Sequence, residues 1–220
     1  YGEISAARVF EVSSNVGIVK LIREHYDDKP EKFLDHLKDY GLTNKIGLPI
    51  KGEGKPIVYY PGKPGWNKIS LEWMSWGYSI AVTPLQTLML YNAVANNGEM
   101  VKPRFIKELR KENRIKKTVK TEILNPQIAS PETIKKLKKV LENVVVKGTA
   151  STIYSPNFSM AGKTGTARID YADLDSWLKD KKYVSSFAGY FPADQPKYSC
   201  IVVIHKPSAD KGYYGADVTG

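Results

Sequence analysis

The sequence has only one cysteine, Cys200, among its 220 residues, so no intrachain disulfide and no multi-cysteine metal site can form. Long apolar runs are also missing. The longest aliphatic stretch, residues 200–204, is far shorter than the ~20 apolar residues that a membrane span needs. Neither a signal-peptide pattern nor a phosphate-binding glycine loop occurs. These absences exclude, within this chain, a disulfide-stapled domain, a membrane span and the common nucleotide-binding loops.

Histidine is scarce as well. His25, His36 and His205 have no second metal ligand at helical or hairpin spacing, so we interpret all three as structural. We therefore expect no metal ion and no cofactor. The first residue is Tyr1 rather than methionine, and we expect the chain to be a piece of a longer protein.

Acidic residues are outnumbered, since 33 Lys and Arg face 23 Asp and Glu and leave a net charge of +10. Hydrophobic residues make up 42% and charged residues 25%, which is typical of a globular domain and excludes a disordered tail. The excess charge gathers between residues 102 and 120, where only Glu108 and Glu112 oppose nine basic residues. This stretch is either a solvated lysine-rich hairpin or a surface for polyanions. No zinc-finger or RNA-recognition signature accompanies it, so we predict no nucleic-acid partner.

Apolar periodicity and capping residues predict helices first and strands last. The predicted helices cover residues 16–26, 30–41, 84–97 and 131–148. The predicted strands cover residues 105–110, 115–121, 158–167, 184–191 and 198–206. Residues 47–66 hold five Gly and four Pro, which predicts a long irregular loop. This order of elements indicates an α+β fold.

The segment Lys163-Thr164-Gly165-Thr166-Ala167 lies on one of the predicted strands. Since side chains alternate along a strand, Thr164 and Thr166 share one face and Lys163 points to the other. Gly165 lets a ligand or another backbone come close. A lysine, two hydroxyls and an open backbone edge could hold a carboxylate and offer N–H donors to a developing oxyanion. The alternative is an ordinary strand with an exposed lysine.

A second segment, Ser13-Ser14-Asn15, comes just before the first predicted helix. Ser and Asn are preferred N-cap residues, so a simple helix cap is one interpretation. The other is a catalytic pair, in which a hydroxyl relays a proton and an amide holds a substrate carbonyl. Only folding could bring this segment to Lys163.

Ser13-x-Asn15 followed by Lys163-Thr164-Gly165 resembles two of the three active-site motifs of the penicillin-binding D,D-transpeptidases. The resemblance covers nearly the whole chain. Within the family, the sequence is similar to the class B enzymes, and Gly77-Tyr78 resembles their division-specific type more than their elongation type. Arg168 and Ser79 depart from the pattern, because many relatives have glutamine and a second glycine there. The other segments that match in family order are residues 75–78, 82–86, 96–98, 147–150 and 186–192.

The resemblance implies a peptidoglycan D,D-transpeptidase that cross-links stem peptides through a serine acyl-enzyme and is acylated by β-lactam antibiotics. Ser13 would relay a proton, Asn15 would hold the substrate amide, and Lys163 would support the relay electrostatically. Thr164 and Thr166, on either side of Gly165, would bind the terminal carboxylate. The Thr166 N–H would form half of an oxyanion hole. The resemblance also implies an extracytoplasmic domain at the cell inner membrane and cell-division membrane proteins as partners.

The nucleophile of this family is the serine of a Ser-x-x-Lys motif that precedes Ser13, but residues 1–12 contain no such motif. Three later segments have a hydroxyl and a lysine at that spacing, and they begin at Thr133, Ser176 and Ser208. All three are out of family order, and we interpret them as chance. We therefore expect the nucleophile to lie outside this chain.

In this family a five-stranded antiparallel sheet carries helices on both sides. We expect residues 1–220 to form one transpeptidase domain that is incomplete at both ends and lacks the nucleophile helix, the first two strands and the last helix. The remaining sheet would have an uncovered edge and face. We predict that the rest of the polypeptide or a second copy covers them.

Two other interpretations stay open. One is a serine β-lactamase or β-lactam-sensor domain of the same fold, although we find no carboxylate motif for a deacylating base. The other is a non-catalytic basic binding module. Covalent labelling of the full-length protein by a fluorescent β-lactam distinguishes all three.

Overall fold

The last third of the chain forms an antiparallel sheet in a computed structural model that describes residues 2–169, 182–208, 210 and 212–219. Its strands are β7 (Ala161–Arg168), β8 (Tyr183–Phe191) and β9 (Tyr198–His205), hydrogen-bonded in the order β7-β8-β9. The three strands predicted for this part of the chain are confirmed.

The pairing register separates the two faces of this sheet. Thr164 lies opposite Phe187, and Lys163 lies opposite Ala188. Because successive side chains point to opposite faces, Thr164 and Thr166 share the face of Phe187, and Lys163 lies on the other face. The alternation predicted for this strand is therefore confirmed.

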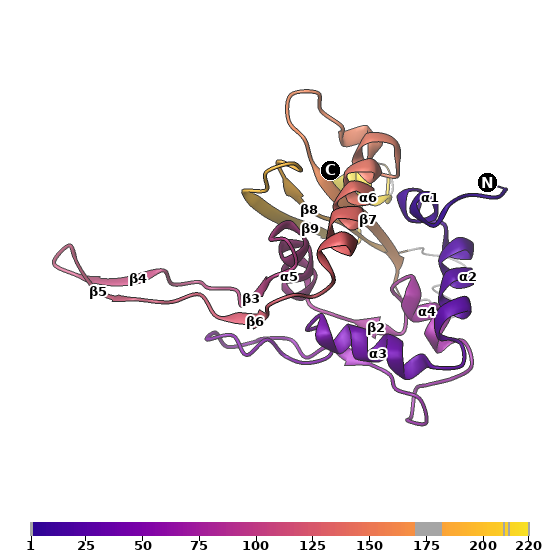
Figure 1. The fold of residues 1–220 in the computed structure, drawn as a ribbon, viewed down its shortest axis with the longest axis horizontal. Coiled ribbons are helices and arrows are strands. Elements are labelled where there is room, and N and C mark those ends of the chain that lie inside the picture. The colour runs from indigo at the N-terminus through magenta and orange to yellow at the C-terminus, as the bar shows by residue number, and fades with distance from the viewer. Residues whose placement is uncertain (1, 170–181, 209, 211, 220) are drawn as a thin grey trace.

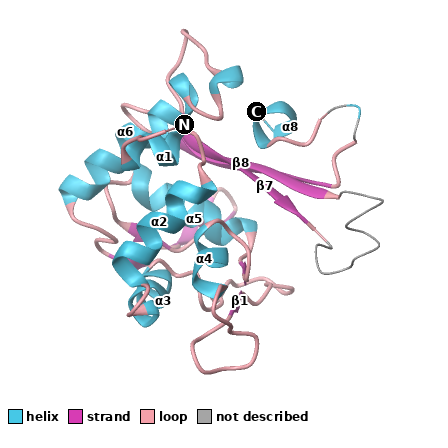
Figure 2. Ribbon diagram, turned by 90° about the vertical axis from the view of Figure 1, so that its right-hand side faces the viewer, coloured by secondary structure: helices cyan, strands magenta, loops and turns pink. Residues whose placement is uncertain are grey.

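Helices lie on both faces, but they leave Val202 and Val203 of β9 exposed. On the Lys163 face lies α5 (Pro84–Ala95), whose Asn92 Nδ2 donates to Ser199 Oγ at 3.1 Å. On the other face lies α8 (Gly215–Thr219), and the Gly215 N–H donates to Thr166 Oγ1 at 3.0 Å. Figure 2 shows α8 and α5 on opposite sides of β7 and β8. The sequence predicts no helix after the last strand, so α8 corrects that prediction.

The longest helix, α6 (Pro131–Lys147), packs against β7 and supplies much of the core. Its Leu141 is buried with Val94 of α5, Ala161 of β7 and Tyr190 of β8. One turn further on, Val144 and Val145 pack on Phe187. The C-terminal end of α6 therefore lies close to the strand that carries Lys163.

Helices α5 and α6 begin where the sequence predicts. Ser130 Oγ accepts the Thr133 N–H at 3.2 Å. Thr83 Oγ1 accepts the Gln86 N–H at 3.3 Å, and the Gln86 side chain accepts the Thr83 N–H in return. This reciprocal pair is a capping box, and Pro84 follows it as the first helical residue.

The first 75 residues are helical apart from one long loop. They form α1 (Ala6–Glu11), α2 (Asn15–Tyr26), α3 (Pro30–Asp39) and α4 (Ser70–Ser75). The helices α2 and α3 are confirmed predictions, whereas α1 and α4 were not predicted. Both have only six residues, too few to display a helical period. Arg23 of α2 holds α4 in place by donating from Nε and Nη2 to Glu72 Oε1 at 2.9 and 2.7 Å.

Short strand pairs connect these helices. They are β1 (Ile57–Val58) with β2 (Ile80–Ala81), and β3 (Met100–Val101) with β6 (Ile123–Asn125). Residues 47–66 are otherwise irregular, as predicted, and η1 (Ser151–Ile153) is a single 3-10 turn after α6. Among the residues that the structure describes, no helix is both long and apolar enough to cross a bilayer.

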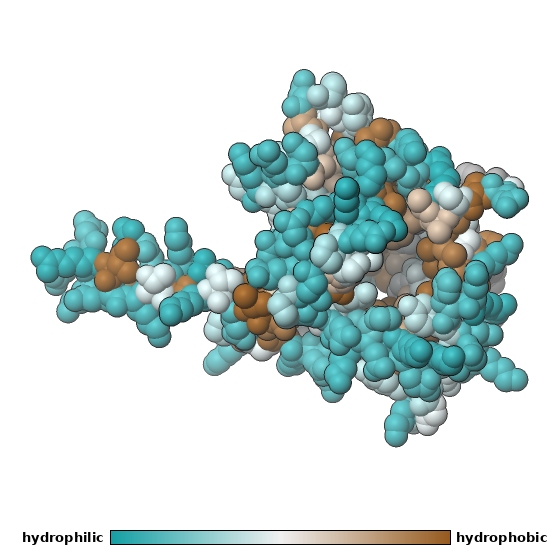
Figure 3. Space-filling view, viewed as in Figure 1, coloured by the Kyte–Doolittle hydropathy of each residue, from teal (hydrophilic) through white to brown (hydrophobic). Residues whose placement is uncertain are grey.

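A two-stranded arm projects from the body of the molecule (Figure 1). Its strands are β4 (Glu108–Lys111) and β5 (Arg114–Thr118), which pair only with each other. Glu112 and Asn113 form the tip with positive φ angles. The basic hairpin that the sequence predicts is therefore confirmed, and Figure 3 shows it as a mostly hydrophilic extension.

Candidate active site

Ser13 lies in the tight turn between α1 and α2. The Ser13 N–H donates to Phe10 O at 3.1 Å, and the Ser14 N–H donates to Val9 O at 3.0 Å. These two bonds form a Schellman motif, which requires a left-handed residue just after the helix. Ser13 supplies it with a φ of 56°. A residue with a side chain is disfavoured there by ~1 kcal/mol relative to glycine, so this exposed serine is kept despite a local cost.

The helix-cap interpretation applies to Ser14 alone. Ser14 Oγ accepts the Gly17 N–H at 3.2 Å and so caps α2. Asn15 is the first residue of the helix and is exposed. The cap therefore uses neither the Ser13 hydroxyl nor the Asn15 amide.

Gly17 fixes how closely α1 approaches α2. A Cβ atom at Gly17 would lie 2.6 Å from both Cγ atoms of Val9, which is far inside van der Waals contact. The absence of that atom lets the Val9 side chain rest on the first turn of α2. The Ser13 turn is therefore held by packing as well as by its hydrogen bonds.

Folding brings Lys163 to Ser13. The Lys163 Nζ donates to Ser13 Oγ at 2.9 Å and to the carbonyl oxygen of Thr164 at 3.0 Å. The two predicted segments therefore meet at their serine and lysine. Burial lowers the pKa of Lys163 to about 8, because the charged amine is poorly solvated. An amine with this pKa is still mostly protonated near neutral pH, so it can place a positive charge beside the Ser13 hydroxyl, and it loses that charge at a lower pH than an ordinary lysine does.

The outer edge of β7 presents backbone donors. The Ile169 N–H points to the β8 side, where it donates to Lys182 O at 2.9 Å. The neighbouring Arg168 N–H points outward and donates to the Tyr78 hydroxyl at 2.8 Å. Since N–H direction alternates along a strand, the Thr164 and Thr166 N–H groups point outward as well. They form an open backbone edge beside Lys163.

Tyr78 marks the end of this edge. Its ring contacts Trp73 in an edge-to-face arrangement at 5.6 Å, and its hydroxyl binds the Arg168 amide. The next residue, Ser79, has a φ of 54°, a region that favours glycine. The glycine that the family resemblance implies at this position therefore suits the backbone. The contact between Tyr78 and β7 was not predicted, because nothing in the sequence relates positions 78 and 168.

The two threonine hydroxyls are already engaged on the face opposite Lys163. Thr164 Oγ1 lies 2.7 Å from Thr149 Oγ1. Thr166 Oγ1 accepts the Gly215 N–H, so its own O–H proton is still available as a donor. Thr166 is exposed, whereas Thr164 is half-buried. Of the two predicted carboxylate ligands, Thr166 is the one in a position to donate to a ligand.

An aromatic cluster flanks Thr166. Tyr183, at the start of β8, stacks on Tyr213 with ring centroids 4.2 Å apart, and Tyr214 lies 4.5 Å from Tyr213. Tyr213 and Tyr214 directly precede Gly215, which binds Thr166. This cluster was not predicted, because Tyr183 is far in sequence from Tyr213 and Tyr214.

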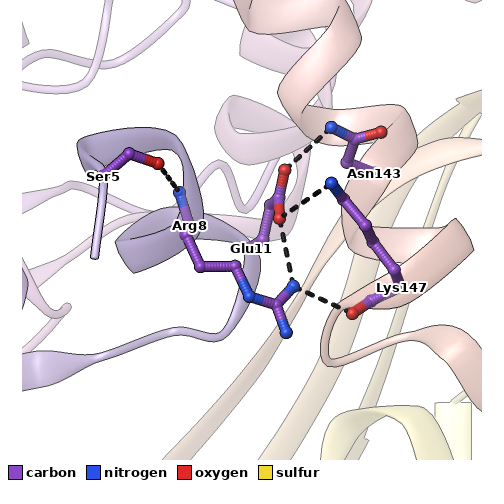
Figure 4. Close-up of polar contacts among 5 residues, drawn as sticks. All are labelled: Ser5, Arg8, Glu11, Asn143 and Lys147. Carbon is purple, nitrogen blue, oxygen red and sulfur yellow. Dashed lines mark hydrogen bonds and ion pairs between the residues drawn. The ribbon is translucent and has the colours of Figure 1, made fainter. Parts of the chain in front are cut away.

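Glu11 is a buried carboxylate that no sequence motif marks. It accepts hydrogen bonds from Arg8 Nη1 at 3.1 Å and from Asn143 Nδ2 at 2.8 Å, and Lys147 Nζ lies 3.8 Å away (Figure 4). Burial alone would raise the pKa of Glu11. The hydrogen bonds from Arg8 and Asn143 and the charge of Lys147 outweigh burial, so its pKa is lowered. A single acidic residue between Phe10 and Val12 gives no pattern by which the sequence could reveal it.

Of the three segments with Ser-x-x-Lys spacing, the one at Thr133 is described in full, and it supplies no second site. Thr133 belongs to the N-terminal cap of α6, and Lys136 pairs with Glu132 at 2.7 Å. The segment that begins at Ser176 lies outside the described residues, as does Lys211 of the segment that begins at Ser208. In the described part of the chain, no cluster of three or more His, Cys, Asp or Glu residues could hold a metal ion.

The family model described as "Penicillin binding protein transpeptidase domain" matches residues 1–220. Stage V sporulation protein D of Bacillus subtilis is 32% identical over 179 residues, which are 80% of this chain and 27% of that protein. Peptidoglycan D,D-transpeptidase FtsI of Escherichia coli is 29% identical over 217 residues, which are 98% of this chain and 34% of that protein. The chain thus spans about a third of the length of these curated relatives.

Solved structures agree with the sequence comparison. The crystal structure of penicillin binding protein 3 from Mycobacterium tuberculosis, complexed with aztreonam, superposes with a TM-score of 0.78 at 28% identity. The match covers 92% of this chain and 45% of that one. A D,D-transpeptidase domain from Eggerthella lenta has a TM-score of 0.80 at 24% identity, which is a likeness of fold. These matches confirm the predicted α+β architecture.

Proposed function

The chain belongs to the penicillin-binding protein transpeptidase domain family, and on this premise we propose that it is part of a serine-type peptidoglycan D,D-transpeptidase of the class B, division-specific kind. One contact carries the proposal: Lys163 Nζ binds Ser13 Oγ at 2.9 Å beside a strand edge with outward N–H groups. A relay hydroxyl, a low-pKa amine and an oxyanion donor are what acyl transfer from a peptide requires.

In the proposed reaction, a serine from a part of the protein outside this chain attacks the penultimate carbonyl carbon of a D-Ala-D-Ala stem peptide. The carbonyl oxygen takes the negative charge, and the outward Thr166 N–H would stabilise it. The proton of the attacking hydroxyl passes through the lysine of the Ser-x-x-Lys motif, which would also lie outside this chain, to Ser13 and on to the departing amide nitrogen. The C–N bond then breaks and D-alanine leaves.

The acyl-enzyme is resolved by the amine of a neighbouring stem peptide, which forms a new amide bond and returns the proton to the serine. Asn15 would hold the substrate amide, and Lys163 would keep positive charge next to the relay. The Thr166 hydroxyl would donate to the terminal carboxylate. Thr164 would act through its contact with Thr149, because its hydroxyl is engaged there.

We further propose that residues 1–220 are one part of this domain. The nucleophile helix and two more strands would come from the rest of the protein. The outer edge of β9, where Tyr198, Val202 and Val203 are exposed, is a surface that such strands could cover. The domain would work outside the inner membrane, with β-lactams as inhibitors and cell-division proteins as partners.

Labelling of the full-length protein by a fluorescent penicillin tests the activity. Slow turnover of a covalent adduct, and release of D-alanine from a stem pentapeptide, are the expected results. Rapid hydrolysis of the drug would instead indicate a β-lactamase of this fold. If the full-length protein is never labelled, a non-catalytic basic module is the better description.

A further inference from the structure

The turn that ends α6 touches both halves of the candidate site. The Thr149 N–H donates to the Glu11 carbonyl oxygen at 3.1 Å, two residues before Ser13. The Thr149 hydroxyl lies 2.7 Å from that of Thr164, next to Lys163. One residue therefore connects the turn that carries the serine to the strand that carries the lysine.

The Glu11 side chain makes the same connection from α1 to α6. Its two oxygens are bound from α1 by Arg8 and from α6 by Asn143, with Lys147 close by (Figure 4). Arg8 Nη1 also donates to the Lys147 carbonyl oxygen at 3.0 Å. Glu11 is 2% exposed, so its carboxylate is shielded from competing water, although the Arg8 and Lys147 side chains that face it reach the solvent.

Gly148 removes the remaining freedom at this junction. A Cβ atom there would lie 2.7 Å from Val144 Cα and still closer to the Glu11 carbonyl oxygen. The backbone of α1 thus rests directly on the last turn of α6. The segment Lys147-Gly148-Thr149-Ala150 matched the family without an evident role, and these contacts supply one.

We propose that Glu11 and Thr149 are positioning residues, which together hold the Ser13 hydroxyl against the Lys163 amine. This inference rests on the proposed transpeptidase function. Neither residue touches the reacting groups. Glu11 fixes the turn of Ser13 to α6, and Thr149 fixes both that turn and β7 to the same point. A displacement of about 1 Å between relay groups can cost about a hundredfold in rate.

Substitutions in the full-length protein test this proposal. Glu11→Gln keeps the side-chain volume but removes the charge that Arg8 and Lys147 face. Thr149→Val removes the hydroxyl that meets Thr164, and Thr149→Ser restores it. Glu72→Gln is the matched control, because Glu72 is also a buried carboxylate bound by an arginine, but it joins α2 to α4.

The readouts are the acylation rate with fluorescent penicillin from about pH 6 to pH 10 and the thermal midpoint. Glu11→Gln and Thr149→Val should slow acylation at least about tenfold. They should also raise the pH at which the rate changes. A Lys163 that is held less tightly is better hydrated, so its pKa rises toward that of an ordinary lysine. Thr149→Ser and Glu72→Gln should keep the wild-type rate and pH profile, even where the midpoint falls.

Two results would overturn the positioning role. One is a wild-type rate and pH profile in both Glu11→Gln and Thr149→Val. The other is an equal change in Glu72→Gln, which would indicate general loosening. A wild-type protein that takes no label would refute the proposed function, and this inference with it.

A separate observation concerns the arm formed by β4 and β5. Its register pairs Leu109 with Lys117 and Lys111 with Arg114, and the Val119 N–H extends the pairing to Lys107. Since cross-strand partners share a face, one face of the arm carries four cations around Leu109 and no acidic residue. We call it the cation face, and its charged members are Lys107, Lys111, Arg114 and Lys117.

The opposite face of the arm is different. There Arg110 Nη2 pairs with Glu108 Oε1 at 2.6 Å, and Ile115 and Thr118 are its neighbours. Apart from Lys116, which the register shift between Leu109 and Arg110 leaves without a cross-strand partner, the unbalanced charge is therefore one-sided. Four residues along a strand span ~13 Å, so the cations form a ridge rather than a pocket. The tip residues are polar and would not enter a bilayer.

We infer that the cation face binds an extended linear polyanion with phosphate or carboxylate groups. A ridge of evenly spread charges suits a chain that lies along it. The full-length protein should bind long-chain polyphosphate, and the apparent affinity should fall steeply with salt. Poly-L-glutamate in place of polyphosphate distinguishes a carboxylate polymer from a phosphate polymer.

A charge-matched pair of variants tests the location. Changing all four charged residues of the cation face to Gln should weaken binding at least about tenfold. Changing Lys20, Lys135, Lys136 and Lys139 to Gln alters the net charge equally on exposed helical positions and should leave binding intact. Equal losses in both variants, binding only to phosphatidylglycerol vesicles, or no binding at low salt would each overturn the inference.

Discussion

The Nζ atom of Lys163 donates a hydrogen bond to the hydroxyl of Ser13 at 2.9 Å, although 150 positions separate the two residues. Ser13 comes from the turn that ends α1, and Lys163 comes from the edge strand of the sheet. Their meeting requires that α1, α6 and β7 pack in one arrangement. The chemistry proposed for this chain therefore depends on the packing around the end of α6.

Substitutions at Ser13 should separate its hydroxyl from its backbone conformation. Both Ser13→Gly and Ser13→Ala remove the hydroxyl, so both should slow β-lactam acylation of the full-length protein. Only glycine relieves the left-handed φ of 56°. Ser13→Gly should therefore be more stable than Ser13→Ala by ~1 kcal/mol in urea unfolding. Equal stabilities would contradict the role of the backbone angle.

Lys163 should give the acylation rate a pH dependence near its lowered pKa of about 8. The rate should fall as pH rises through this value, because the amine loses the charge that supports the relay. Lys163→Arg stays charged and should lose the inflection while it keeps part of the rate. Measuring acylation from about pH 6 to pH 10 in both proteins checks this. An unchanged inflection in the arginine variant would assign it to another group.

The same shift has a consequence for stability. The pKa of Lys163 falls from 10.5 on folding, so the folded state binds fewer protons than the unfolded state between pH 8 and pH 10.5. The penalty for burying the charge is complete below about pH 8 and is relieved as pH rises. The thermal midpoint of the wild type should therefore rise as pH increases from about 8 to 10.5, and this rise should be smaller in Lys163→Met.

Glu11 should stabilise the fold in the opposite pH range. Its pKa is lowered from 4.5 on folding, so its contribution is complete above that value and is lost as pH falls through the lower, folded value. Urea midpoints measured between about pH 3 and pH 6 should fall more steeply in the wild type than in Glu11→Gln. If the urea midpoints of the two proteins fall in parallel, other carboxylates cause the loss of stability at low pH.

Gly148 should not tolerate a methyl group. Gly148→Ala would press a Cβ atom against the backbone of α1 and of Val144, which should cost ~3 kcal/mol of unfolding free energy. Gly62→Ala is the control, because Gly62 has a φ of 71° but no neighbour within 4 Å. It should cost only ~1 kcal/mol. Chemical denaturation of the two variants compares them, and similar losses would rule out a steric cause.

Tyr78→Phe should loosen the end of the candidate active-site strand. It removes the acceptor of the Arg168 N–H hydrogen bond and keeps the ring that contacts Trp73. We expect a loss of ~1 kcal/mol and faster hydrogen exchange at the Arg168 amide. Tyr154→Phe, at an exposed position, should leave that amide unchanged.

The sequence predicted the elements whose signals are local. Thr83-Pro84 and Ser130-Pro131 marked the starts of α5 and α6, and the strand pattern after residue 158, with a turn at residues 192–197, predicted the three strands of the main sheet. It missed α1 and α4, which are too short for a helical period. Which of Ser13 and Ser14 caps α2 could not be predicted either. Serine is a good cap at both positions, and only the Schellman turn distinguishes them.

The supporting contacts of the candidate site could not be read from the sequence, because they are long-range. Glu11 meets Asn143 across 132 positions, and Tyr78 meets Arg168 across 90. Thr164 and Thr166 were assigned to one face correctly. Their hydroxyl partners, Thr149 and the Gly215 amide, depend on where the end of α6 and the start of α8 pack.

The left-handed turn at Ser13 also restricts which residues evolution can place there. Glycine and asparagine accept the backbone angle but lack a relay hydroxyl, whereas threonine has the hydroxyl but is β-branched and poorly suited to the angle. A saturation library at position 13 should therefore retain almost nothing but serine under selection for activity. Under selection for folding alone, the same library should favour glycine.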